Sequence, residues 1–225
     1  MSVHTAPASS RTPQRQALSP VVLQPSLSKE EINLLPLRAW EGNIALVQDE
    51  ESLSAALEDM RRENVLGFDT ETKPTFTKGK TSQPALIQLA TANTVYLIQL
   101  TRLPFRADIA ELLASPHALK VGVAINDDMK ALARILPFKA DGVVDLAAMA
   151  RARGIQAQGL RTLAANLLGF RISKTAQCSN WENHELSPQQ IKYAATDAWV
   201  GRELYFHMLR QSGSQTRPRG DKTPA

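Results

Sequence analysis

Five side chains in three separate segments have the types and spacing of a site that could hold divalent cations. Asp69 and Glu71 stand in the sequence VLGFDTE, and Asp128 ends the sequence KVGVAINDD. Tyr193 and Asp197 begin and end the sequence YAATD. Carboxylate oxygens are the ligands that hard cations prefer, and such sites leave positions open for water and phosphate. The four acids and the phenol therefore predict a two-metal phosphodiesterase site.

The first segment has the pattern of a buried strand that ends in acids. Residues 65–68 form a short apolar run, and side chains alternate along a strand, so Asp69 and Glu71 point the same way. Buried carboxylates lose hydration and repel one another, which costs several kcal/mol per ion unless a cation or hydrogen-bond donors compensate. Two alternatives need no metal, because Asp69 could cap a turn and Glu71 could pair with Lys73.

The third segment has the signals of a helix start. Ser187 suits the N-cap, Pro188 the first helical position, and Gln190 the third position of a capping box. Tyr193 and Asp197 are then four residues apart on one helical face, where both can address one site. The alternative is a core tyrosine and a surface acid.

The second segment predicts a strand over residues 120–125 followed by a helix that opens with Asp127 and Asp128. Acids at a helix start are also favoured by the helix macrodipole, so capping is the alternative for both. The spacing alone leaves open which of the two acids would bind a metal.

Together, the three segments resemble the DEDD superfamily of 3′-5′ exonucleases, in the tyrosine subgroup (DEDDy) that includes ribonuclease D, proofreading domains and the Werner-syndrome exonuclease domain. The resemblance spans residues 40–210 and is closest to the Werner-like branch, through FDTETKP, ALIQL, CSNW and YAATDA. It implies an α/β, RNase H-like fold in which a mixed five-stranded sheet is flanked by helices and the acids meet at one edge.

The resemblance also implies a role for each site residue. Asp69 would bridge two Mg²⁺ or Mn²⁺ ions, Glu71 and Asp197 would complete the first, and Asp128 would support the second, partly through water. Tyr193 would orient the attacking water.

The family pattern favours Asp128 over Asp127 as the metal-binding acid. It places apolar residues directly after the aspartate and at its fourth position, as Met129 and Leu132 stand here. Asp127 stays a candidate.

The remaining pattern predicts one domain, residues 36–210, between a disordered N-terminal extension at 1–35 and a flexible basic tail at 211–225. Apolar runs predict five strands, at 65–71, 85–91, 94–100, 120–125 and 142–146, with a hairpin turn at 92–93. Helical patterns occur at 50–64, 107–114, 128–136, 147–154, 160–168 and from 187 onward.

The net charge of +4 comes from the two ends of the chain, because residues 36–209 hold 19 basic and 19 acidic side chains. Phosphate would therefore be attracted by local arrangement and bound metal. The cations best placed for substrate contact are Lys73, Lys78, Lys80, Arg171 and Lys174. Their alternative is a solvated loop position.

The single cysteine, Cys178, excludes an intramolecular disulfide and fits a reducing cytoplasm, where we expect the protein. Residues 1–28 hold no acid and no apolar run suited to a signal peptide or membrane helix, and we expect no membrane partner. Arg11 and Arg15 would also suit an organelle transit peptide, although four prolines interrupt its helix. Trp181 is expected to pack the loop before the last helix rather than to stack on a base.

The sequence thus predicts a metal-dependent 3′-5′ exonuclease that releases nucleoside 5′-monophosphates from a nucleic-acid 3′ end, with DNA slightly favoured over RNA. Ribonuclease D-like RNA trimming is the nearer alternative, since it uses the same chemistry and differs only in the contacts made to the sugar. A catalytically silent nucleic-acid-binding module is the other, although no motif acid is missing.

Overall fold

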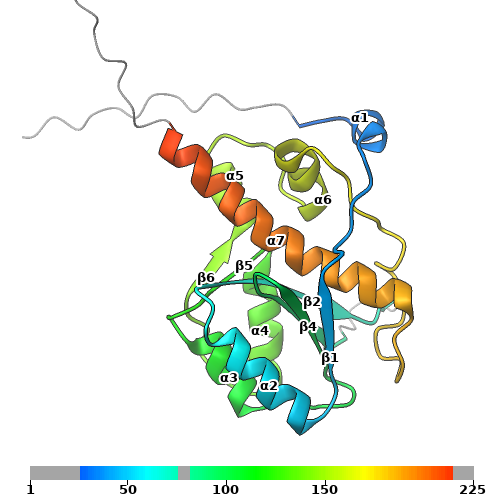
Figure 1. Ribbon diagram of the computed structural model, residues 1–225, viewed down its shortest axis with the longest axis vertical. Coiled ribbons are helices and arrows are strands. Elements are labelled where there is room, and N and C mark those ends of the chain that lie inside the picture. Colours follow the sequence, from blue (N-terminus) through cyan, green and yellow to red (C-terminus); the bar gives the residue numbers. More distant parts are fainter. Residues whose placement is uncertain (1–25, 76–81, 215–225) are drawn as a thin grey trace, which may run out of the picture.

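The computed structural model describes residues 26–75 and 82–214, which form one mixed sheet with helices on both faces (Figure 1). The strands are β1 (Asn43–Val47), β2 (Val65–Thr72), β3 (Pro84–Ala90), β4 (Thr94–Gln99), β5 (Leu119–Gly122) and β6 (Val143–Asp145). The helices are α1 (Lys29–Leu34), α2 (Glu50–Met60), α3 (Ala107–Ala114), α4 (Ile125–Ile135), α5 (Leu146–Arg151), α6 (Leu160–Leu163), the π-helical η1 (Ala164–Leu168) and α7 (Pro188–Ser214).

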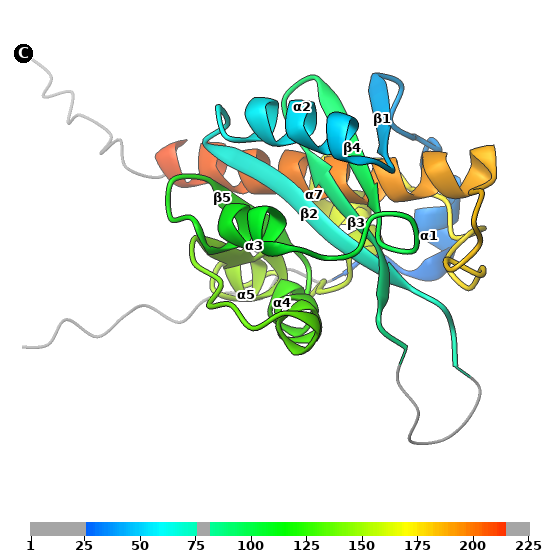
Figure 2. The same ribbon diagram turned by 90° about the horizontal axis from the view of Figure 1, so that it is seen from below.

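The six strands lie in the order β1-β4-β3-β2-β5-β6, with β2 running through the middle of the sheet (Figure 2). β2 pairs antiparallel with β3 and parallel with β5, and β3 and β4 form the predicted antiparallel hairpin. Because β2 and β5 are parallel, the carboxyl end of β2 and the start of α4 after β5 lie at the same edge of the sheet. This topology brings the first two acidic segments together.

Each face of the sheet has its own apolar core. The core that contains α2, α3 and α4 packs against Leu66 and Phe68 of β2. α7 covers the opposite face and packs on β2 and β3, where Leu86 and Ala90 meet Ala194 and other small side chains of the helix. Figure 1 shows α7 on one side of the sheet and α2 and α3 on the other.

The close contact of α7 with β2 depends on small residues. A Cβ atom on Gly67 would lie 2.0 Å from the backbone oxygen of Ala198, so no side chain fits there without moving the helix. Ala194 and Ala198 are fully buried at this contact. The helix therefore lies directly on β2, and its Asp197 comes close to Asp69.

The start of α7 is the capping box that the sequence predicts. The backbone N–H of Gln190 donates to Ser187 Oγ over 3.2 Å, and the backbone N–H of Ser187 donates to Gln190 Oε1 over 3.0 Å. These bonds satisfy donors that a helix start leaves without partners, which fixes the phase of α7 and the common face of Tyr193 and Asp197.

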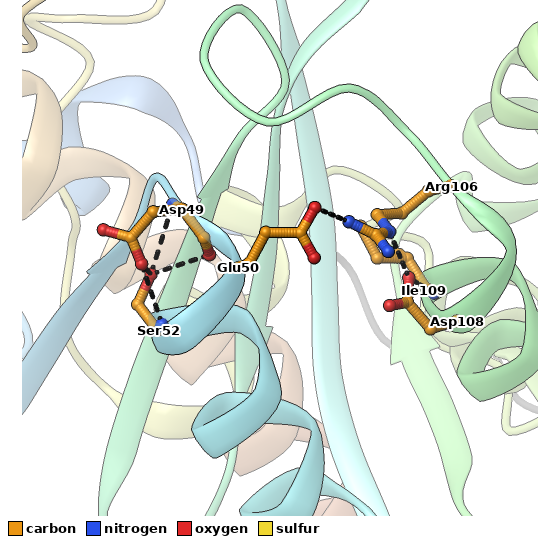
Figure 3. A network of polar contacts seen from close by, with 6 residues as sticks. All are labelled: Asp49, Glu50, Ser52, Arg106, Asp108 and Ile109. Carbon is orange, nitrogen blue, oxygen red and sulfur yellow. Dashed lines mark hydrogen bonds and ion pairs between the residues drawn. The ribbon is translucent and has the colours of Figure 1, made fainter.

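On the other face, a polar network joins the starts of α2 and α3 (Figure 3). Asp49 caps α2, because its Oδ1 accepts from the backbone N–H of Ser52 over 2.8 Å. Arg106 precedes α3 and pairs with both Glu50 of α2 and Asp108 of α3. All these side chains are at least partly exposed, so the network orients the two helices rather than adding much to stability.

The prediction of five strands is wrong, because the sheet has a sixth strand, β1. This strand pairs in parallel with β4, the outer strand of the hairpin. Of its five residues, Val47 alone is buried, so the period-2 pattern that marks a strand is weak here. The mixed α/β class and the RNase H-like arrangement of strands flanked by helices are confirmed.

The predicted N-terminal extension is also shorter than residues 1–35, since α1 falls inside it. A capping box joins Ser28 and Glu31, and the backbone N–H of Leu27 donates to Asn166 Oδ1 over 3.0 Å. Arg171 Nε holds the following segment through the carbonyl oxygen of Leu35. Residues 1–25, and the tail from residue 215 onward, lie outside the described residues. Within the described part of the chain, no helix has the length and apolar character needed to cross a membrane.

Candidate active site

A cleft of about 430 Å³ brings together acids from β2 and α7. Asp69 and Glu71 line it from the end of β2, and Tyr193 and Asp197 line it from α7. The rest of its wall comes from Thr70, Val123, the segment 159–162, Lys174 and Gln177. The structure thus places four of the five predicted catalytic residues at one surface that is open to solvent.

The charges in the cleft are poorly compensated. Burial and the charges of Asp197 and Asp128 hold the pKa of Asp69 well above its usual value. Burial, with the charges of Asp69, Asp197 and Asp128, raises the pKa of Glu71 to about 9. Burial likewise raises the pKa of Asp197 to about 7 and that of Asp128 to about 6. The four carboxyl groups therefore belong to a single electrostatic cluster.

The structure distinguishes the two acids at the start of α4. Asp127 is exposed and pairs with Lys130 at 2.8 Å on the outside of the helix. Asp128 faces the cleft acids, and its Oδ1 accepts a hydrogen bond of 2.7 Å from the hydroxyl of Thr70 on β2. The chain turns into α4 at Ala124, whose φ of 56° lies in the left-handed region and costs about 1 kcal/mol. Asp128 is therefore the acid that belongs to the site.

Tyr193 is held as a neutral phenol. Burial raises its pKa, and the charges of Asp197, Glu71 and Asp69 raise it further. Its ring packs against that of Trp181, with the centroids 6.0 Å apart, and Trp181 is fully buried. The expectation that Trp181 packs the loop is confirmed. Tyr193 can therefore donate a hydrogen bond in the cleft but is a poor base.

The donor chemistry of the cluster fits a divalent cation. Buried carboxylates that raise one another's pKa have too little positive charge near them to balance their own charge. For Asp197, the cation that lowers the pKa is Arg161. Among residues 26–75 and 82–214, no three acidic, histidine or cysteine side chains already form a closed ligand set. Thr70 orients two of the acids, because its N–H donates to Asp69 and its hydroxyl donates to Asp128. Metal binding would therefore reorient carboxylates that are already close together.

The five predicted substrate-binding cations differ in where they lie relative to the cleft and in what they contact. Lys174 lines the cleft. Lys73 pairs with Glu182 at 2.9 Å, with both side chains exposed, and Arg171 Nε donates to the Leu35 oxygen, so substrate contact by either cation stays a prediction. Lys78 and Lys80 lie outside the described residues.

The sequence interpretation missed Arg161 and Thr70. Arg161 lines the cleft, is fixed by a hydrogen bond of 3.0 Å from its Nε to the Ile172 oxygen, and acts on both Tyr193 and Asp197. Thr70 lies between Asp69 and Glu71 and links the cluster to Asp128. No motif quoted from the sequence includes Arg161, and its distance of more than thirty residues from Tyr193 gave no local signal.

The raised pKa values predict how pH affects the metal-free fold. Since the folded state holds protons that the unfolded chain releases near pH 4, stability in EDTA should fall as pH rises from about 4.5 to 9, the range set by Glu71. A divalent cation binds the charged acids, so the increase in melting temperature that it produces should be larger at pH 9 than at pH 6. Thermal unfolding of wild type and Glu71→Gln, with EDTA or Mg²⁺, measures this. The variant should lose part of the pH slope, and an equal slope in both proteins would contradict the assignment.

Three acids, a neutral phenol and an arginine line an open cleft on an RNase H-like sheet, and Asp128 is linked to them through Thr70. This combination is typical of a nuclease that hydrolyses phosphodiester bonds. Comparison with known proteins agrees. A family model described as 3′-5′ exonuclease matches residues 44–212. The mouse bifunctional 3′-5′ exonuclease/ATP-dependent helicase WRN is 31% identical over 181 residues, which cover 76% of this chain and 13% of that protein. Ribonuclease D of Gluconacetobacter diazotrophicus is 30% identical over 171 residues, which cover 74% of this chain and 42% of that protein.

Among solved structures, the exonuclease domain of Nibbler from Aedes aegypti superposes with a TM-score of 0.71 at 28% identity. The match covers 80% of this chain and 94% of that one. Escherichia coli RNase D shares the fold, with a TM-score of 0.66 at 21% identity.

The chain belongs to the 3′-5′ exonuclease family, whose members are hydrolases that act on nucleic acids and use divalent metal ions. It spans 13%, 28% and 25% of the length of the first three curated relatives that it matches.

Proposed function

We propose that this chain removes nucleoside 5′-monophosphates one at a time from the 3′ end of a nucleic acid, with Mg²⁺ or Mn²⁺ as cofactor and DNA as the preferred substrate. The observation that carries the proposal is the convergence of Asp69, Glu71, Tyr193 and Asp197 in one cleft, with Asp128 linked to it through Thr70. This cluster can hold metal, water and a phosphate group together.

The chain's own residues would have distinct roles in the reaction. Asp69, Glu71, Asp128 and Asp197 would hold two divalent ions, which lower the pKa of bound water and stabilise charge on the attacking and leaving oxygens. Tyr193, kept protonated, donates a hydrogen bond that orients the attacking water. Arg161 and Lys174 supply positive charge for the phosphate in the same cleft. The water gives up a proton to solvent as its oxygen bonds to phosphorus, the bond from phosphorus to the 3′ oxygen breaks, and that oxygen takes up a proton from solvent and leaves as a hydroxyl.

Substrate choice is the finer part of the proposal. The Werner-like motifs of the sequence are the reason for preferring DNA. Similarity to a bacterial ribonuclease D supports RNA trimming as the second candidate. The two differ in whether the 2′-hydroxyl of the terminal sugars is tolerated.

The test uses four strands of one sequence: all DNA, all RNA, DNA with one terminal ribonucleotide and RNA with one terminal deoxynucleotide. With Mg²⁺ or Mn²⁺, we expect the all-DNA strand to have the highest kcat/KM. A higher value for all-RNA would replace DNA by RNA as the substrate and leave the exonuclease assignment intact. Binding of the strands without any hydrolysis would instead support the silent module.

A further inference from the structure

Gln88, in the middle of β3, is a fully buried side chain without a hydrogen-bond partner. Its Nε2 and Oε1 both lack a partner among the described residues. Gln99, on the adjacent strand β4, is equally buried but fully bonded. Its Nε2 donates to the backbone oxygens of Asn183 and His184, and its Oε1 accepts from Gln48. The two glutamines therefore share their burial and differ in whether their amides are satisfied.

The position of Gln88 relates it to the acid cluster. It pairs directly with Asp69 across the β2–β3 ladder, and Glu71 is the diagonal neighbour two residues along β2. Directly opposed side chains of a ladder share a face, and diagonal neighbours are within reach of long side chains. The other side of Gln88 is closed by Leu97 of β4, which belongs to the apolar core under α7. Gln88 thus lies between Leu97 on one neighbouring strand and the acids of β2 on the other.

The amide is also close enough to Glu71 to affect the ionisation of that carboxyl group. Burial and the neighbouring charges raise the pKa of Glu71, and the Gln88 side chain acts in the opposite direction, toward the charged form. Glu71 is therefore an acceptor near the unpaired Nε2, although the two groups do not form a hydrogen bond of normal geometry here.

An unsatisfied buried amide is costly. Leaving such a group without a partner destabilises the folded state, and an apolar side chain of similar shape would avoid that cost. Gln88 therefore destabilises the metal-free fold at a position where Met or Leu would pack. A role for the Gln88 amide when the acids hold metal ions would account for a glutamine at this position.

We propose that Gln88 is a positioning residue: when the cluster holds its metal ions, Gln88 Nε2 donates to the Glu71 carboxylate and fixes its orientation. The inference rests on the proposed function, which says that the acid cluster holds divalent metal ions. It has a physical precedent in the hydrogen bonds that orient metal-binding carboxylates in proteins, whose loss typically weakens metal binding by 10- to 100-fold.

The test compares Gln88→Met with Gln99→Met in the full chain, since Met keeps the length of the side chain and removes its polar atoms. Three quantities are measured: the melting temperature in EDTA, the dissociation constant for Mn²⁺ alone by calorimetry, and kcat and KM on a single-stranded oligonucleotide. For Gln88→Met we expect an unchanged or higher melting temperature, Mn²⁺ affinity about tenfold weaker, and a lower kcat with KM within twofold. For Gln99→Met we expect a lower melting temperature with unchanged Mn²⁺ affinity.

A second variant, Gln88→Asn, keeps the amide but shortens its reach by one methylene, and should weaken Mn²⁺ binding in the same way. If Gln88→Met lowered the melting temperature in EDTA as much as Gln99→Met and left Mn²⁺ affinity unchanged, the glutamine would be structural and the inference wrong. Calorimetry with Mn²⁺ needs no substrate, so a wild-type protein that binds Mn²⁺ without hydrolysing strands would count against the proposed function and not against this role.

Discussion

Asp69→Asn should abolish hydrolysis while the protein stays folded. The charges of both Asp197 and Asp128 act on Asp69, and the substitution removes the charge of Asp69 while barely changing its volume. Residues that act as a catalytic unit lose most activity when one member is removed, so the expected loss of kcat is on the order of 10³-fold or more. The melting temperature in EDTA should stay equal or rise, because a source of repulsion is removed. Single-turnover digestion of a 5′-labelled strand and thermal unfolding measure the two effects.

The matched control for this variant is Asp127→Asn. Asp127 is also an aspartate next to the site, but it is exposed and paired with Lys130 on the outside of α4. We expect near wild-type turnover from it. Near wild-type turnover of Asp69→Asn at saturating Mg²⁺ would refute the assignment of the cluster as a metal site.

Tyr193→Phe should lower kcat by about 10²-fold or more and leave metal affinity nearly unchanged. The phenyl ring can keep its packing on Trp181, and only the hydroxyl that orients water is lost. Because the phenol stays protonated, the variant should keep the wild-type shape of the pH–rate profile at a lower level. A profile that lost a basic limb on substitution would show that the tyrosine acts as a base.

Two variants separate the role of Tyr193 from general damage to α7. Tyr205→Phe removes another buried hydroxyl of the same helix, away from the cleft, and should keep wild-type kcat. Asp197→Ala should raise the Mg²⁺ concentration needed for half-maximal activity, because a ligand is lost. Equal metal midpoints for wild type and Asp197→Ala would contradict the division between ligand and water-orienting group.

The sequence predicts those parts of the site that depend on local signals. The capping box at Ser187 fixes the phase of α7, and strand alternation places Asp69 and Glu71 on one face, so both pairs could be assigned before the fold was known. The choice of Asp128 over Asp127 came from a resemblance in pattern, and the structure supplies its physical reason in the hydrogen bond to Thr70.

The parts that the sequence did not predict depend on contacts between distant segments. Arg161 enters the cleft because its Nε is held by the backbone at Ile172, and Gln88 meets Asp69 through strand register. The sequence does not predict β1, because this strand is short and half exposed and so has no clear alternating pattern. It forms by pairing with β4, which is distant in the sequence. Arg171, which is predicted to contact phosphate, also holds the segment after α1 through its Nε, a role that no pattern around it indicates.

The measurement that tests the central claim most directly is digestion of one DNA strand labelled either at its 5′ end or at its 3′ end, with Mg²⁺, Mn²⁺ or EDTA. With metal, the 5′-labelled strand should shorten through a ladder of single-nucleotide steps, and the 3′ label should appear at once as a nucleoside 5′-monophosphate. EDTA and Asp69→Asn should each stop both reactions. Internal fragments, shortening from the 5′ end, or equal digestion in EDTA would contradict the account.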